Sequence, residues 1–127
     1  MNWYKYSKLE TFEDRNKLNK RIKFLKEAVS KLNYLKKYVF QNAPHAKRVM
    51  MEMAENKIMS SFPVFKNLMK DCSSTALDNY EKFAEGCEII IEKLVDKIKE
   101  LEKERKEFSN NFNQERIKND RKDKSDS

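Results

Sequence analysis

Residues 77–112 read LDNYEKFAEGCEIIIEKLVDKIKELEKERKEFSNNF, and apolar positions recur in this stretch after three and four residues alternately. That spacing averages about 3.5 residues, the period that keeps one narrow stripe of a helix facing a neighbouring helix. The pattern predicts a helix from about Ala76 to about Phe108 that packs along a partner helix. Ten of the eleven stripe positions are apolar or semi-apolar, and the eleven are Leu77, Tyr80, Ala84, Cys87, Ile91, Leu94, Ile98, Leu101, Arg105, Phe108 and Phe112.

A second long helix is predicted in the first part of the chain, from about Lys8 to about Gln41. It ends before Pro44, because the residue that precedes a proline disfavours helical backbone. Pro44 and Pro63 each suit the first turn of a shorter helix that follows. The apolar positions of the first helix again lie three or four residues apart, at Leu18, Ile22, Leu25, Val29, Leu32, Leu35 and Val39.

The composition supports an all-α fold. The 127 residues include one glycine and two prolines, too few for the frequent turns of a fold with many strands. We therefore expect a small helical bundle in which two long helices are joined by two shorter helices, with a seam like that of a coiled coil. We assign residues 1–108 to this bundle domain and interpret residues 109–127 as a polar, disordered tail.

Details around the start of the last helix give three further expectations. The run Ser73-Ser74-Thr75 offers oxygens to cap the start of this helix, with Asp78 completing a capping box. Gly86 lies within the helix, where a glycine costs about 1 kcal/mol relative to alanine, and we interpret it as a point of close packing. We expect Cys72 and Cys87 to be buried thiols, and a disulfide between them is the alternative.

No apolar run exceeds three residues, whereas a membrane-spanning helix needs about 20. The first eight residues lack the apolar stretch of a signal peptide. We therefore expect a cytoplasmic protein with no membrane contact. Lysine and asparagine dominate the polar residues, a usage typical of an AT-rich genome such as that of a low-GC bacterium, a phage or a protozoan.

The sequence carries no pattern typical of catalysis, so we expect no enzyme, no cofactor and no metal site. His45 is the one histidine, and no nucleophile or acid lies at a diagnostic spacing from it. One glycine cannot form a phosphate-binding loop. A row of glutamates on the last helix lacks the histidines of a carboxylate metal bundle, and we interpret it as a solvated face: Glu81, Glu85, Glu88 and Glu92.

Charge is unevenly distributed along the chain. The net charge is +7, and residues 1–42 alone carry +7, whereas residues 73–108 carry −3. On the predicted first helix, lysines and aromatic residues alternate at positions that point away from the apolar stripe. Three interpretations stay open for them: core contacts with the shorter helices, a protein-binding face, or nucleic-acid binding with lysines on phosphates and rings on bases. The candidate partner-binding residues are Lys17, Lys20, Phe24, Lys31, Tyr34 and Tyr38.

These observations predict a non-enzymatic helical binding protein, an adaptor or inhibitor that acts through protein–protein contacts, with size and composition typical of a phage or mobile-element product. The alternative is a small nucleic-acid-associated subunit that binds phosphates through the basic first helix. A second alternative is a structural oligomer. The apolar stripes of the two long helices extend beyond what the two shorter helices between them can cover. We therefore also expect a dimer or other homo-oligomer.

Overall fold

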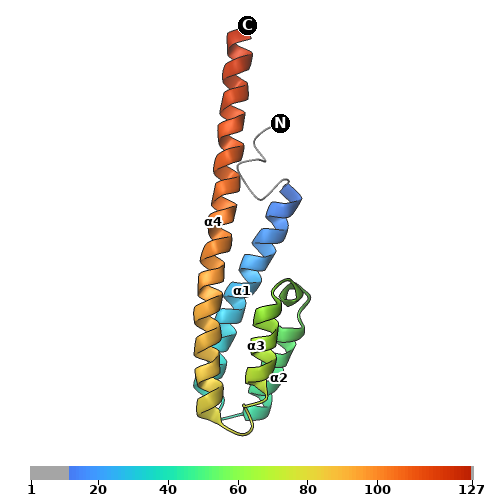
Figure 1. The fold of residues 1–127 in the computed structure, drawn as a ribbon, viewed down its shortest axis with the longest axis vertical. Coiled ribbons are helices and arrows are strands. Elements are labelled where there is room, and N and C mark those ends of the chain that lie inside the picture. Colours follow the sequence, from blue (N-terminus) through green and yellow to red (C-terminus); the bar gives the residue numbers. More distant parts are fainter. Residues whose placement is uncertain (1–11, 127) are drawn as a thin grey trace. The chain divides into compact units, whose positions relative to one another are not determined.

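A computed structural model describes the backbone of residues 12–126 and the side chains of residues 12–111 (Figure 1). The elements in chain order are α1 (Phe12–Tyr38), α2 (Ala43–Glu55), the 3₁₀ helix η2 (Lys57–Ser61), α3 (Pro63–Ser73) and α4 (Tyr80–Asp126). No strand occurs among the described residues. The expected all-α bundle, with two long helices joined by shorter ones, is confirmed. The predicted start of the first helix near Lys8 lies outside the described residues.

The chain divides into two compact units, and each long helix contributes to both. Unit 1 contains the chain up to Ile22 and from Lys99 onward, and unit 2 contains Lys23–Ile98. In unit 2, α2 and α3 lie side by side (Figure 1). Glu55, at the end of α2, joins them, because its carboxylate accepts a hydrogen bond from Lys70 at 3.0 Å and pairs with Lys66 at 3.8 Å. These lysines of α3 lower the pKa of Glu55, Lys70 more than Lys66.

The core of unit 2 combines leucines with methionines. Methionine is unbranched and polarisable, so it fills irregular gaps between helices. Lys36 of α1 also pairs with Glu88 of α4 at 3.4 Å on the surface of this unit. The core side chains that are less than 2% exposed include Leu25, Leu32, Met50, Met59, Met69, Phe83, Cys87, Ile90 and Leu94.

Unit 1 is held by a smaller set of contacts between α1 and α4. Leu18, Ile22, Leu101 and Phe108 are buried. The ring of Phe12 meets Phe108 edge-on, with centroids 5.9 Å apart. Across the same unit, Nη1 of Arg105 donates a hydrogen bond to Oδ1 of Asn19 at 3.1 Å.

The buried stripe of α4 differs from the predicted one before Leu94. Phe83 and Ile90 are buried, whereas the predicted positions Ala84 and Ile91 are only half-buried and Tyr80 is 48% exposed. From Leu94 onward, the predicted positions Leu94, Ile98, Leu101 and Phe108 are buried, while Arg105 is half-buried. The prediction was wrong by one residue because Ile89-Ile90-Ile91 offers three equivalent apolar candidates. On α1, likewise, Ala28 is buried in place of Val29.

The hydroxyls predicted to cap the start of the last helix instead close the end of α3. Ser73, Ser74 and Thr75 donate to the carbonyl oxygens three residues earlier, at 2.7–2.8 Å. Asn79 caps α4 by accepting a hydrogen bond from the backbone N–H of Lys82 at 3.0 Å. Serine and threonine can serve either end of a helix, so their presence alone did not decide between the two roles.

The predicted end of the last helix near Phe108 is also wrong, because α4 continues to Asp126. An apolar pattern reports where a helix packs, and residues 109–126 include no glycine or proline that would stop it. The division between a bundle domain of residues 1–108 and a disordered tail of residues 109–127 stays a prediction.

The register of α4 can be tested with two neighbouring isoleucines. Ile90 is 1% exposed and Ile89 is 51% exposed. We expect Ile90→Ala to lower the free energy of unfolding by about 2–5 kcal/mol, because it opens a cavity in the core. The matched control, Ile89→Ala, should lower it by clearly less, because removing this exposed side chain leaves no cavity in the core. Urea unfolding followed by circular dichroism measures both, and equal losses would contradict the register.

Candidate partner-binding face

Two adjoining hollows lie between α1 and α2 in unit 2. The chain leaves α1 at Tyr38 and enters α2 at Ala43, where the Asn42 side chain accepts a hydrogen bond from the backbone N–H of His45 at 3.1 Å. This cap fixes where α2 starts against α1. One hollow, of about 240 Å³, is lined by Tyr34, Leu35, Tyr38, Gln41, Asn42, His45 and Ala46. The other, of about 400 Å³, is lined by Ser30, Lys31, Tyr34, Leu35, His45, Val49 and Glu52.

Tyr34 stands between the two hollows, because it lines both. The residue is 54% exposed. Its ring lies 5.0 Å from that of Tyr38 between centroids, tilted by 48°. Nζ of Lys37 lies 5.4 Å from the centroid of the Tyr38 ring, a cation–π contact. Two aromatic rings in mutual contact thus form an accessible surface on this side of α1.

The α2 side of the hollows carries a line of polar groups. A guanidinium nitrogen of Arg48 lies 2.9 Å from Nδ1 of His45, and Nε of Arg48 lies 4.0 Å from the carboxylate of Glu52. Arginine can only donate, so Nδ1 of His45 is the acceptor of this hydrogen bond. The imidazole is therefore held by a neighbour on its own helix.

The structure brings three of the six predicted partner-binding residues together, namely Lys31, Tyr34 and Tyr38. Phe24 is half-buried and lines neither hollow. Lys17 and Lys20 are exposed but belong to unit 1, and Lys17 lies 3.9 Å from Glu13. The interpretation of Tyr34 as a core residue is wrong, given its exposure.

Sequence reasoning missed the contribution of α2. His45, Val49 and Glu52 lie four and three residues apart, so they share one side of a helix. That spacing was a usable signal. It did not reveal that this side lies next to the tyrosines of α1, because the apolar residues of α2 define a different face.

The two cysteines form a buried contact between α3 and α4. Both are free, as expected. The thiol of Cys72 donates to the backbone carbonyl of Phe83 at 3.4 Å. A hydrogen bond from Cys87 lowers the pKa of Cys72, and the same bond, with burial, raises the pKa of Cys87. Each thiol thus has a partner within the core.

Gly86 explains how α3 and α4 come so close. A Cβ atom added to Gly86 would lie 2.5 Å from Sγ of Cys72, a separation that real Cβ atoms do not adopt. The expectation that this glycine marks close helix packing is confirmed. This close packing also explains why a glycine, despite its weak helix propensity, lies inside α4.

Within the described residues, no three or more histidine, cysteine or acidic side chains are grouped so as to hold a metal ion. Over the same part of the chain, no helix combines the length and the apolar character that crossing a membrane requires. Comparisons of this protein with protein-family models, with curated proteins and with solved structures found no match.

A double-mutant cycle can test the contact between Gly86 and Cys72. Gly86→Ala should gain about 1 kcal/mol in helix propensity but lose about 1–3 kcal/mol to overpacking, so we expect a net loss of stability. In a Cys72→Ala background Sγ is absent, and Gly86→Ala should become stabilising. Thermal unfolding of the four proteins measures the coupling. The same effect of Gly86→Ala in both backgrounds would contradict the close contact.

Proposed function

We propose that this protein is a non-enzymatic adaptor or inhibitor that binds another protein through the face of α1 and α2 around Tyr34. The observation that carries this proposal is the exposed Tyr34 ring standing between two hollows. Tyrosine is enriched among residues that dominate binding energy, because its ring offers large contact area and its hydroxyl offers a hydrogen bond. Hollows on both sides would receive side chains of the partner.

The lining of the two hollows favours a protein over a nucleic acid as the occupant. Lys31 is the only lysine or arginine among the lining residues, and Glu52 lies in the same hollow. A phosphate backbone requires several cations to replace its counterions. Rings, aliphatic groups, amides and one charge of each sign are typical of a protein–protein interface. This face therefore supports the protein-binding interpretation of the tyrosines.

Self-association is a second part of the proposal. Ile89 of α4 stays 51% exposed, and it borders a hollow of about 320 Å³ that Leu68 of α3 and Ile90 also line. We propose that two copies associate through the surface around Ile89. Light scattering should give a dimer mass for the wild-type protein and a monomer mass for Ile89→Asp, because the aspartate would place an unpaired charge in the interface. A monomer mass for the wild-type protein would overturn this part.

The protein-binding face can be tested by affinity purification from the native host with quantitative mass spectrometry. We expect a protein retained by the wild-type chain to be lost from the double variant Tyr34→Ala/Tyr38→Ala. Phe40→Ala is the matched control, because Phe40 is 60% exposed and lines neither hollow. Losing a central tyrosine typically costs about 2 kcal/mol or more in binding, roughly a thirtyfold change in affinity.

Circular dichroism should show that the double variant keeps its helicity and its melting temperature. An equal loss of the retained protein from Phe40→Ala would contradict the assignment of this face. A retained nucleic acid that is lost from the double variant, with affinity that falls steeply as salt rises, would favour the alternative function through the basic first helix.

A further inference from the structure

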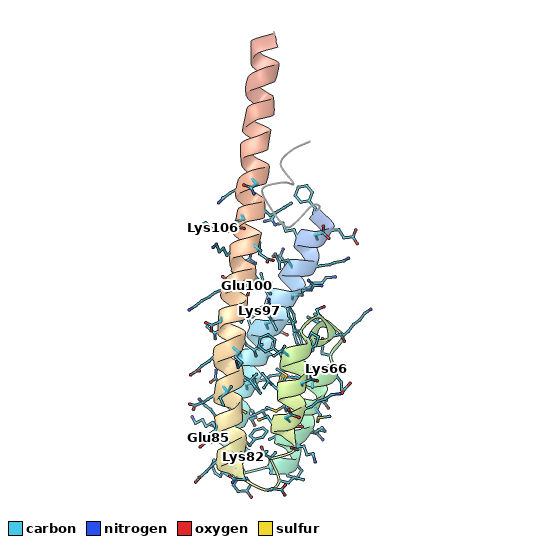
Figure 2. All side chains as sticks on the ribbon, viewed as in Figure 1. Lys66, Lys82, Glu85, Lys97, Glu100 and Lys106 are labelled. Atoms are coloured by element: carbon cyan, nitrogen blue, oxygen red, sulfur yellow. The ribbon has the colours of Figure 1, made fainter. Side chains whose placement is uncertain are left out.

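A separate hollow in unit 1 gathers positive charge. It has a volume of about 530 Å³ and lies between the first turns of α1 and the part of α4 that starts at Lys99. Glu102 is its single acidic lining residue, and Ser109 also borders it. Figure 2 shows Lys106 projecting from α4. Five cations line this hollow: Arg15, Lys99, Lys103, Arg105 and Lys106.

The helix separates charges that cancel in the sequence. Residues 99–107 contain four basic and four acidic residues, so their net charge is zero. Lys99, Lys103 and Lys106 follow each other after four and three residues, which places them on one side of α4. The glutamates at 100, 104 and 107 repeat the same spacing one position later, about 100° further around the helix. None of these three glutamates lines the hollow.

The two arginines of the hollow have unused hydrogen-bonding capacity. Nε of Arg15 is buried and has no hydrogen-bond partner. Arg105 is held in place by Asn19, which accepts from one of its nitrogens at 3.1 Å. A guanidinium has five N–H donors, so most of those on Arg105 remain for another acceptor. A buried donor without a partner is costly, and the guanidinium of Arg15 adds its positive charge to the lining of the hollow.

We propose that this hollow binds the sugar–phosphate backbone of a single-stranded nucleic acid. From Lys99 to Lys106 the helix rises about 10 Å, which is more than one phosphate group can span. Phe12 lies three residues before Arg15 on the same side of α1, and the residue is 54% exposed. Proteins that hold single strands combine such cationic grooves with rings on which unpaired bases stack. The site shares no residue with the Tyr34 face and does not rest on the function proposed for it.

Fluorescence anisotropy with a labelled single strand of about 20 nucleotides, as DNA and as RNA, tests this site. We expect Lys103→Gln/Lys106→Gln to weaken binding at least tenfold. It should also reduce the slope of log affinity against log salt by about 1.4, because each phosphate contact contributes about 0.7 for single strands. The control Lys82→Gln/Lys93→Gln removes the same charge from the same helix, outside the hollow, and should bind within about twofold of wild type. Equal losses in the two variants would overturn the proposal.

Arg15→Met separates ligand binding from folding. The methionine removes the unpartnered donor, so the melting temperature of the free protein should stay the same or rise, while oligonucleotide affinity falls. A lower melting temperature with unchanged affinity would assign Arg15 a purely structural role and overturn its part in the site. Tighter binding to a duplex of equal length, or to phosphatidylserine vesicles, than to the single strand would also overturn the proposal.

Discussion

The close approach of α3 to α4 at Gly86 sets the register on which the rest of unit 2 depends. With no side chain at Gly86, Sγ of Cys72 occupies the space beside the α4 backbone, and its thiol reaches the carbonyl of Phe83. That contact fixes the rotation of α4, because Phe83, Cys87 and Ile90 then face the core together. A one-residue rotation would turn Ile89 inward and leave the Cys72 thiol against a different part of the helix.

The fold class and the elements followed from the spacing of apolar residues, which depends only on the helical period. The rotation of α4 about its axis before Leu94 did not follow from that spacing. Where Ile89, Ile90 and Ile91 are equally apolar, the sequence offers no local reason to bury one of them. The deciding contact involves Cys72, on another helix, so it is a tertiary effect. The burial of Ala28 in place of Val29 is similar, since a small side chain is favoured only where another helix comes close.

Of the Tyr34 face, only the α1 side could be predicted from the sequence. Alternating lysines and aromatic residues identified Lys31, Tyr34 and Tyr38 on α1, yet the same pattern also included Lys17 and Lys20, which belong to the other unit. The α2 contribution depends on which helix packs beside α1, which no pattern within α2 states. The cationic hollow of unit 1 was not predicted, for a different reason. Charge summed over residues 99–107 is zero, and only the helical geometry separates the signs.

The methionine content of the core has a consequence for how the Tyr34 face meets a partner. Met50 and Met53 lie on α2, Met59 on η2 and Met69 on α3, and all four are buried. Their unbranched thioether side chains can exchange rotamers at low energetic cost. The α2 half of the face therefore rests on a deformable support, whereas the leucines beneath the α1 half have better-defined rotamers. Such a face can adjust to partners of somewhat different shape, but binding then costs the conformational entropy of the side chains that become ordered.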